Sequence, residues 1–543
     1  MCITATIALA LLLQAPASAK ASIEGRVVRA GTNDPIARVE VIARREDGSR
    51  TLPPVTTDAQ GHFVIKDLDP GLYSLGANRN GFAPQTYGQR KPRGPGTELN
   101  LSAGQELKDL VFRLIPAGAI SGRITDETGE PLMGINVGIE ETVYWESGAR
   151  HFQAAKTATT DDRGEYRVFM LPPGRYYMKA APFFAGVLEK GLINPNYVDT
   201  YYPGVPDTAS AAAIDLDPGA EVGGIDLVLR RQQLFSIHGR LVDSRTGKPP
   251  VSRPAFELRR RDSGDGVRVG STDYDPANGT FSLLNVPPGT YWVVASLRMM
   301  RVNEQDRLIG ATRIARAPVD LSTSDIANVL LQVPPDMSIA GRISMDDGSG
   351  VSNVQDLGVN LRMNEPSGAI AGPSEAPVRP DGTFLIENVQ PGDYKLWLSP
   401  PQWKHYIKAA RLDGNDVLNG VQISAAPSEG LALVLGSDTA HVEGTIVDSD
   451  HKPVTGVEVV LIPTRERERR DMYRTAITDQ RGRFTLLPTV PGEYKLFAWE
   501  DFEGFAYMDP DFLHKYEELG TPVNVVPSGA SDVEVKLIPA SRQ

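Results

Sequence analysis

Apolar and polar residues alternate in short stretches along the whole chain, and no long stretch shows a helical period. The alternation is clear in "PGTYWVVAS" (288–296), where Tyr291, Val293 and Ala295 fall on one face. A period of two residues indicates a strand with one buried face. Related phrases return at 70–77, 173–180, 391–398 and 491–498. The sequence therefore predicts five strand-rich repeats.

A tyrosine opens the strand that follows each Pro-Gly pair. Proline and glycine suit the two central positions of a type II turn, so we expect the chain to reverse there with a positive φ at the glycine. A tyrosine at a strand start can bury its ring and use its hydroxyl for a hydrogen bond. We therefore expect a structural role for these residues, which are Tyr73, Tyr176, Tyr291, Tyr394 and Tyr494.

Two further motifs recur. Each repeat begins with a strand that contains a glycine, as in "SIEGRVV" (22–28) and "AISGRIT" (119–125). A Thr-Asp-x-x-Gly-x-aromatic phrase follows at 57–63, 160–166 and 478–484, with variants at 275–281 and 379–384. Its glycine is expected to be left-handed at a hairpin tip. Short strands with turns at this spacing are typical of a β-sandwich.

The chain of 543 residues is too long for one hydrophobic core. We predict an all-β protein, a tandem array of five antiparallel seven-stranded β-sandwich modules of immunoglobulin-like or prealbumin-like type. The predicted boundaries are a signal peptide at 1–19, then repeat 1 at 20–117, repeat 2 at 118–234, repeat 3 at 235–336, repeat 4 at 337–437 and repeat 5 at 438–543.

The combination of the glycine-containing first strand, the Thr-Asp-x-x-Gly hairpin and the Pro-Gly-x-Tyr strand resembles the carboxypeptidase regulatory-like domain. This is a transthyretin-like or collagen-adhesin-B-like sandwich that is often grouped with carbohydrate-binding-like folds. The resemblance covers the chain after residue 20. It implies non-catalytic modules of secreted, surface-attached or outer-membrane-associated bacterial proteins, which serve as stalks, spacers or ligand-binding accessories. The motifs specify turns and core, so they indicate a fold rather than an activity.

The N-terminus carries an apolar run from Ile3 to Leu13, followed by the small-residue segment Ala17–Ala19. This order is typical of a cleaved export signal. A membrane anchor is the alternative, but the run is short for the roughly 30 Å of bilayer hydrocarbon. We therefore predict an exported mature chain without a transmembrane segment, in the periplasm, at the cell surface or outside the cell. The single cysteine, Cys2, lies within the signal, which excludes disulfides from the mature chain.

The chemistry-bearing residues do not form an enzyme motif. The one His-x-x-Glu, at His514 and Glu517, lacks a downstream third ligand, so we expect no metal, no cofactor and no catalytic residue. The Asp-rich turn at 273–279 lacks the closing glutamate of a calcium loop, which leaves only incidental calcium as an alternative. A net charge of −12 argues against nucleic acid as a partner.

Aromatic residues gather beside polar ones in the segments of variable length. Such pairs suit stacking on sugar rings, contact with a protein partner, or packing of the loop on its own sandwich. We predict an exported non-catalytic scaffold or binding protein of the bacterial envelope or extracellular space, with carbohydrate binding as the alternative and with glycans or envelope proteins as partners. The candidate ligand-binding residues are Tyr201, Tyr202, Trp403, Tyr406, Trp145, Trp499, Phe505 and Tyr507.

Overall fold

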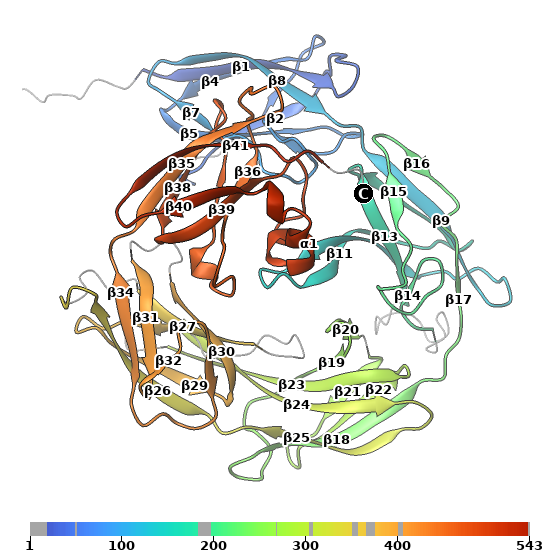
Figure 1. Ribbon diagram of the computed structural model, residues 1–543. Coiled ribbons are helices and arrows are strands. Elements are labelled where there is room, and N and C mark those ends of the chain that lie inside the picture. Colours follow the sequence, from blue (N-terminus) through green and yellow to red (C-terminus); the bar gives the residue numbers. More distant parts are fainter. Residues whose placement is uncertain are drawn as a thin grey trace, which may run out of the picture. The chain divides into compact units, whose positions relative to one another are not determined.

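The structure is a computed structural model that describes residues 19–48, 52–182, 197–267, 269–302, 308–349, 357–364, 375–399 and 405–540. The predicted export signal lies outside these residues, apart from Ala19. The described chain is built almost entirely from strands, as predicted (Figure 1). It divides into two compact units, Met1–Ala117 and Gly118–Gln543.

The first unit contains the residues of repeat 1 and holds two sheets. One has the strand order β4-β1-β8, and the other has β3-β2-β5-β6 with β7 paired to β5. The strands are β1 (Ala21–Arg29), β2 (Glu40–Arg45), β3 (Val55–Thr56), β4 (His62–Leu68), β5 (Gly71–Asn78), β6 (Gln85–Thr86), β7 (Leu99–Leu101) and β8 (Glu106–Leu114). Their alternating apolar residues form one buried cluster that includes Ile23, Leu75 and Phe112.

The second unit begins with two strand sets that belong to repeats 2 and 3. The first set is β9 (Gly118–Asp126), β10 (Asn136–Tyr144), β11 (Arg150–Thr159), β12 (Glu165–Leu171), β13 (Gly174–Ala181), β14 (Thr200–Tyr201), β15 (Ile214–Leu216), β16 (Glu221–Val222) and β17 (Leu227–Leu229). The second set is β18 (Phe235–Asp243), β19 (Ala255–Arg260), β20 (Gly266–Val267), β21 (Ser271–Tyr274), β22 (Thr280–Val286), β23 (Gly289–Val302), β24 (Leu308–Leu321) and β25 (Ile326–Val333).

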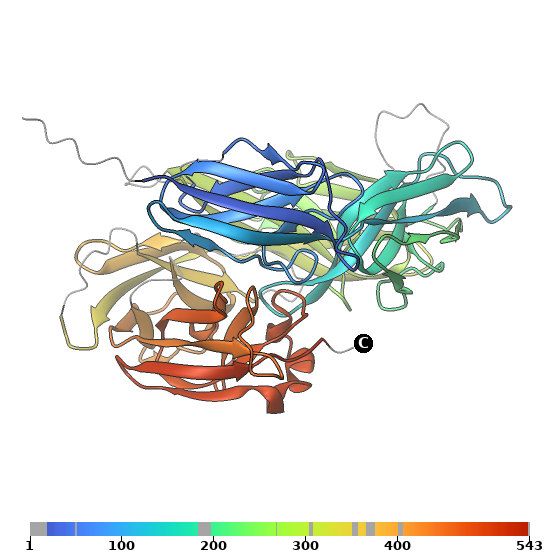
Figure 2. The same cartoon turned by 90° about the horizontal axis from the view of Figure 1, so that it is seen from above.

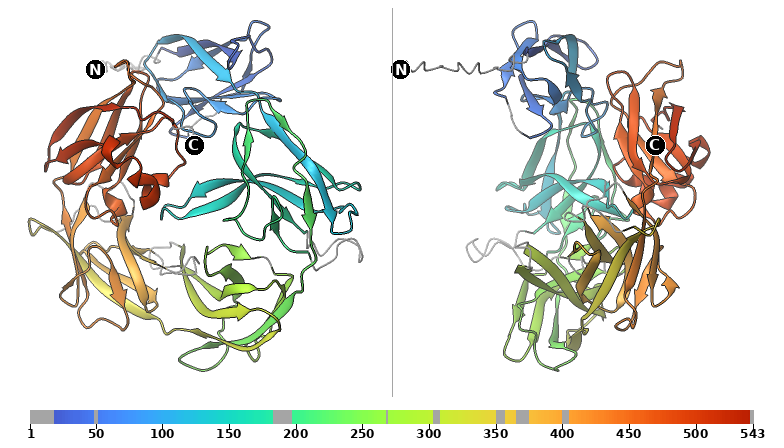
Figure 3. Two further views of the ribbon diagram at one scale, coloured as in Figure 1. Left: turned by 45° about the vertical axis from the view of Figure 1, so that its right-hand side comes forward. Right: turned by 90° about the vertical axis from the view of Figure 1, so that its left-hand side faces the viewer.

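Repeats 4 and 5 supply the remaining elements. Repeat 4 holds β26 (Met337–Met345), β27 (Gly358–Met363), β28 (Ala376–Pro377), β29 (Thr383–Val389), β30 (Gly392–Ser399), β31 (Tyr406–Leu412), β32 (Asn415–Asp416), β33 (Val421–Ile423) and β34 (Leu431–Gly436). Repeat 5 holds β35 (Ala440–Val447), β36 (Glu458–Pro463), β37 (Arg474–Ile477), β38 (Arg483–Thr489), β39 (Gly492–Ala498), β40 (Thr521–Val525) and β41 (Ala530–Lys536). Its short helices are η2 (Arg470–Met472), η3 (Ala506–Met508), α1 (Pro510–His514) and η4 (Glu517–Leu519), which lie in the red part of the ribbon (Figures 2 and 3).

The sheets follow one plan in every strand set. The glycine-containing first strand lies inside its sheet, with the hairpin strand antiparallel on one side and a closing strand parallel on the other, as in β4-β1-β8 and β38-β35-β41. The second sheet is antiparallel, as in β37-β36-β39-β40. The predicted all-β fold with paired sheets is confirmed, and the first sheet adds one parallel pairing to its antiparallel ones.

Among the described residues, the five largest buried apolar clusters each draw on one predicted repeat. The tyrosine that opens the Pro-Gly strand is buried in all of them. Each of these tyrosines donates its hydroxyl to a backbone carbonyl just before the strand, at 2.7 Å for Tyr494 and Val490 and at 3.1 Å for Tyr73 and Asp69. The structural role predicted for these residues is confirmed.

The hairpin motif also has the predicted conformation. Its glycine has a positive φ of 71–80° in every repeat, at Gly61, Gly164, Gly279, Gly382 and Gly482. The aspartate of the motif accepts hydrogen bonds from the backbone two and four residues later, as Asp161 does from Arg163 and Glu165 at 2.9 and 2.8 Å. These bonds satisfy the turn backbone, which is the usual use of an aspartate at such a position.

The threonine before that aspartate is buried and ties the hairpin to the second strand. Thr160 accepts a hydrogen bond from the Ile135 amide at 2.9 Å and donates to the Leu132 carbonyl at 2.6 Å. Thr57 and Thr478 make the equivalent pair of bonds. One hydroxyl therefore satisfies two backbone groups that are otherwise left without partners.

Replacing Thr160 by valine removes both bonds while keeping the shape of the side chain. Because a buried polar group without a partner costs about 1–3 kcal/mol, we expect the free energy of local unfolding around β10 and β12 to fall by about 2–4 kcal/mol. Hydrogen–deuterium exchange of the full chain measures this loss. Thr160→Ser, which retains the hydroxyl, is the control, and equal losses in the two variants would refute the role of the hydrogen bonds.

The Pro-Gly pair does not form the predicted type II turn. Of the five glycines, Gly71 alone has a positive φ, at 151°, and the strand begins at the glycine itself. The left-handed residue lies further upstream, at the bulge of the hairpin strand: Asp67, Met170, Asn285 and Asn388, with a cis Leu487-Pro488 bond in repeat 5. In repeat 3 the glycine instead leaves room for the tyrosine two residues later, since a Cβ at Gly289 would lie 2.5 Å from the Tyr291 hydroxyl oxygen.

The glycine of each first strand is required for a different reason. A Cβ there would lie 2.0–2.6 Å from a carbonyl oxygen of the neighbouring closing segment. The aromatic ring of the hairpin motif packs against the same position, as Phe484 does at Gly444 and Phe281 at Gly239. A glycine with a cross-strand aromatic partner is thus a fixed part of each sandwich.

Candidate functional site

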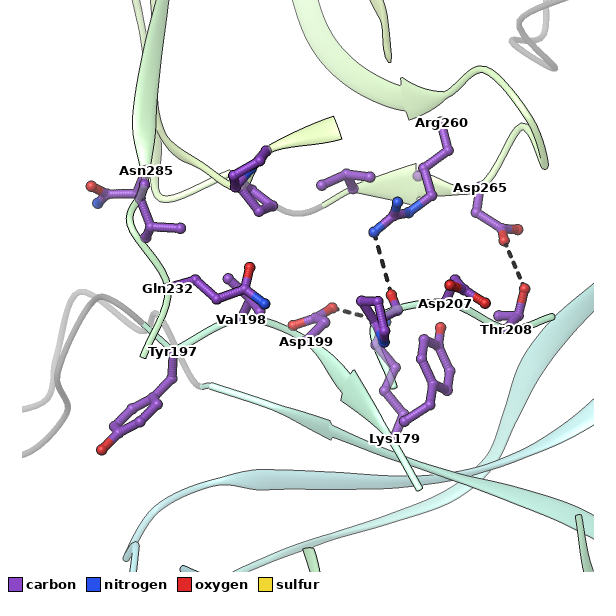
Figure 4. Close-up of a pocket in the computed structure, with 17 residues that line it drawn as sticks. Lys179, Tyr197, Val198, Asp199, Asp207, Thr208, Gln232, Arg260, Asp265 and Asn285 are labelled. Atoms are coloured by element: carbon purple, nitrogen blue, oxygen red, sulfur yellow. Dashed lines mark hydrogen bonds and ion pairs between the residues drawn. The ribbon is translucent and has the colours of Figure 1, made fainter. Parts of the chain in front are cut away.

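A cavity of about 430 Å³ lies in the second unit, where residues of repeats 2 and 3 face each other (Figure 4). One wall comes from β13 and the segment 197–208 before and after β14. The other comes from the end of β19, from β20 and from the segment after β22, and Gln232 and Leu234 of the connecting segment complete the lining. Tyr201, a candidate from the sequence, is among the lining residues.

An ion pair and an aromatic ring form the first wall. The Lys179 ammonium lies 2.9 Å from an Asp199 carboxylate oxygen and 5.6 Å from the centre of the Tyr201 ring. Burial by itself would lower the pKa of Lys179, but the Asp199 carboxylate together with Tyr201 and Glu140 outweighs it and the pKa is raised. Burial raises the pKa of Tyr201 to about 12, against the opposing effect of Lys179. At neutral pH this wall therefore presents a charged amine, its carboxylate partner and a neutral phenol.

The second wall reaches across to the first through polar contacts. The Arg260 guanidinium donates to the Pro206 carbonyl at 3.3 Å, and the Thr208 hydroxyl donates to the Asp265 carboxylate at 3.4 Å. Figure 4 shows Arg260 and Asp265 on the repeat 3 side, facing the segment that carries Asp207 and Thr208. Tyr197 points away from the cavity, and its hydroxyl accepts from Arg231 at 3.3 Å.

Further aromatic residues adjoin Tyr201 on the sheet that contains β11, β10, β13 and β14. The Phe152 ring stacks on Tyr177 with centroids 4.3 Å apart and meets the Tyr201 ring edge-on at 6.2 Å. The Arg150 guanidinium lies 5.8 Å from the Phe152 ring. These rings continue the apolar surface outward from the Tyr201 side of the cavity.

The other two candidates of repeat 2, Trp145 and Tyr202, lie outside the cavity lining. Trp145, at the tip between β10 and β11, is 58% exposed and stacks on the His151 ring with centroids 3.8 Å apart. Tyr202 packs against the repeat 2 core, and its amide donates to the Met178 carbonyl at 2.9 Å. The sequence placed Tyr201 and Tyr202 together, but only Tyr201 lines the cavity.

Two candidates of repeat 5 lie in a second buried cluster. Trp499 and Tyr507 are 3% and 4% exposed and pack with Phe497, Phe502 and Leu513 between the β36–β39 strands and the segment with η3 and α1. They therefore offer no free ring face to a ligand. Phe505, which is 40% exposed, has a left-handed backbone with a φ of 63°.

The structure describes only one of the two candidates of repeat 4, Tyr406. Trp403 lies outside the described residues. The Tyr406 hydroxyl donates to the Asp438 carboxylate at 2.9 Å, and burial together with this bond raises the pKa of Tyr406. This hydroxyl links the start of β31 to the segment that leads into repeat 5.

The glutamate of the His-x-x-Glu phrase makes ion pairs within its own repeat. Glu517 accepts from Arg467 at 2.8 Å and from Lys495 at 3.0 Å, and these cations lower its pKa although burial opposes them. Within the described ranges no group of three or more His, Cys, Asp or Glu side chains is placed to hold a metal ion. Among the helices that the structure describes, none has both the length and the hydrophobicity to span a lipid bilayer.

Residues 22–114 and 119–186 match the family model described as the carboxypeptidase regulatory-like domain. Both segments are thus similar to carboxypeptidase regulatory-like domains. The resemblance inferred from the turn and core motifs is thereby confirmed for these segments, and the sheet plan of these domains recurs in the strand sets that follow.

Comparison with solved structures finds bacterial proteins, two of them pilins, at low identity. The Bacillus anthracis TIE protein is 14% identical over 58% of this chain and 51% of that chain, with a TM-score of 0.17. The Streptococcal ancillary pilin is 12% identical over 58% and 99%, with a TM-score of 0.20, and the minor pilin GBS52 of Streptococcus agalactiae is 15% identical over 40% and 97%, with a TM-score of 0.22. The chain thus spans about half the length of the first of these structures. Comparison with curated proteins gives no significant match.

The polar residues of the cavity were not predicted from the sequence. Lys179 occupies a polar position within the Pro-Gly-x-Tyr strand, and Arg260 and Asp265 belong to a charged stretch that resembles any exposed turn. The available signal was the length of the segment after β13, which separates β13 from β15 and brings Tyr201 back to the sheet.

Proposed function

We propose that the chain is a non-catalytic scaffold or binding protein of the bacterial envelope or extracellular space. One observation carries the proposal: the recurrent polar residues are engaged by the fold itself. The motif tyrosines bond to backbone carbonyls, and the motif threonines satisfy two backbone groups each. The part of the sequence that repeats is therefore structural, and recognition falls to the segments that differ between repeats.

Contacts between consecutive repeats of the second unit support a scaffold role. Gln390, which is 2% exposed, accepts from the Ile314 amide at 2.9 Å and donates to the Ile314 carbonyl at 3.1 Å. Arg469 donates to the Ile407 carbonyl at 2.9 Å. Bonds of this kind hold adjacent sandwiches in register, which suits a protein whose task is to present surfaces at fixed spacing.

The N-terminal sequence supports the proposed location outside the cytoplasm. The apolar run Ile3–Leu13 with its small-residue site is the pattern of an export signal, and the chain after Cys2 has no cysteine that an oxidising compartment would cross-link.

Cell fractionation tests this proposal. We expect the full chain, expressed in a bacterium and treated with a cross-linker, to appear outside the cytoplasm, shortened at its N-terminus and joined to an envelope component. Leu12→Arg places a charge in the apolar run and serves as the control, which should remain in the cytoplasm at full length. Recovery of the unaltered chain in the cytoplasm, or its export without any cross-linked partner, would contradict the proposal.

Carbohydrate binding is the second candidate. It is favoured by the cavity, which joins the Tyr201 ring to carboxylate, amide and guanidinium groups, since sugars need both an apolar face and hydrogen-bonding partners.

A further inference from the structure

The cavity between repeats 2 and 3 has the size and composition of a small-molecule site. Its volume of about 430 Å³ falls within the roughly 300–1,000 Å³ of such sites. The lining mixes apolar groups, including Tyr201, Leu234 and Pro287, with polar side chains that converge from two sandwiches. These polar groups come from segments that the repeated motifs do not fix.

The charges of the lining are close to balanced. Three carboxylates, of Asp199, Asp207 and Asp265, face two cations, Lys179 and Arg260. Lys179 already pairs with Asp199 at 2.9 Å, and Arg260 is held by the Pro206 carbonyl. The cavity therefore has no surplus of positive charge for an anion, and its cations reduce the attraction of the carboxylates for a positive ligand.

The hydrogen-bonding capacity suits a ligand rich in hydroxyl groups. The Asp265 carboxylate accepts one bond from Thr208 and retains acceptor positions, and the Gln232 and Asn285 amides add donors and acceptors. A hydroxyl group can donate to a carboxylate and accept from an amide or guanidinium, whereas an apolar ligand would leave these groups without partners.

The Tyr201 ring supplies the apolar surface. Its phenol stays neutral at physiological pH because burial raises its pKa to about 12, and its outer edge continues into Phe152. The C–H face of a sugar ring stacks on such a surface.

We infer that this cavity binds a short neutral saccharide, with Tyr201 as the stacking residue and with Asp265, Arg260 and the two amides as hydrogen-bonding partners. The inference rests on the carbohydrate-binding candidate above and assigns it to one place, the junction of repeats 2 and 3, whose lining mixes residues of both repeats.

Calorimetry on residues 20–543 tests the site with defined probes. The neutral set is cellobiose, maltose, mannobiose, xylobiose and N,N′-diacetylchitobiose, and the charged set is digalacturonic acid and chitosan disaccharide. We expect at least one neutral disaccharide to bind with a dissociation constant on the order of millimolar. Tyr201→Ala should weaken this binding about tenfold, while Tyr201→Phe, which keeps the ring, should change it less than about threefold.

Two further variants locate the binding. Asp265→Asn preserves the size of the side chain and removes its charge, so we expect affinity to fall several-fold without loss of folding. Phe169→Ala, which removes an exposed ring outside the cavity lining, is the matched control and should bind as the unaltered chain does. Circular dichroism and thermal unfolding of each variant confirm that its sandwiches are intact.

The outcomes separate the inference from the proposed function. Binding that survives Tyr201→Ala in a folded protein, or that Phe169→Ala abolishes instead, overturns the cavity assignment and leaves carbohydrate binding standing. Binding of the charged sugars alone overturns the neutral ligand. Binding of no probe overturns the inference, while the fractionation result still decides the scaffold proposal by itself.

Discussion

Replacing Tyr291 by alanine is expected to lower the free energy of local unfolding of β22 and β23 by about 3–5 kcal/mol, because the ring is fully buried and its removal leaves a cavity. The lost hydroxyl adds to this, since it bonds to the Pro287 and Pro288 carbonyls at 2.9 and 3.1 Å. Hydrogen–deuterium exchange of the full chain resolves this repeat from the others, which a single melting curve of a multi-domain protein does not.

Two control variants apportion the effect of Tyr291. Tyr291→Phe removes the hydroxyl alone and should cost about 1–2 kcal/mol. Trp292→Ala lies on the other face of the strand, where the ring is only partly buried against Val294, Ile314 and Met363, and should cost clearly less than Tyr291→Ala. Equal losses at Tyr291 and Trp292 would show that the alternation does not set the core.

Replacing Gly444 by alanine should be comparably damaging although it adds only one carbon. The new Cβ would lie 2.0 Å from the Val533 carbonyl oxygen and 2.9 Å from the Phe484 ring, so β41 and the aromatic residue must both move. Overpacking of this kind costs about 1–3 kcal/mol, and the disrupted ladder between β35 and β41 adds to it, so we expect about 3 kcal/mol or more.

Gly504→Ala in the same repeat is the matched control, because a Cβ there meets no atom within 4 Å and the backbone φ is not positive. It should change the free energy of unfolding by less than about 0.5 kcal/mol. The measurement is exchange at the β35 and β41 amides. Similar exchange in both alanine variants would mean that the first-strand glycine is dispensable.

The local parts of the fold could be predicted because their causes are local. Alternation places Tyr291, Val293 and Ala295 in the core, and the hairpin glycines take the left-handed conformation that their motif requires. The Pro-Gly turn was misjudged because the phrase is compatible with two geometries. Only the packed Tyr291 shows that Gly289 provides space, and the left-handed residue lies instead at the bulge upstream.

Features that depend on residues far apart in the sequence could not be predicted from local patterns. The parallel pairing of first and closing strands joins residues more than eighty positions apart, such as Ile23 and Leu107, and no local pattern encodes it. The burial of Trp499 depends on the segment with η3 and α1, which lies over the outer face of its sheet and which periodicity does not reveal. The cavity needs Lys179 and Arg260, which are ordinary polar residues until two sandwiches bring them together.

The parallel ladder has a mechanical consequence. In repeat 1 it runs from Ser22 paired with Glu106 to Arg29 paired with Leu114, so the chain enters at one end of the ladder and leaves at the other. Tension between these ends pulls the two strands past each other along their length. The hydrogen bonds of the ladder are then strained together rather than opened one at a time, and the same geometry joins β18 to β25 and β35 to β41. A pull along the chain therefore meets shear resistance in each of these repeats, and a sandwich opens only when several bonds break in one event.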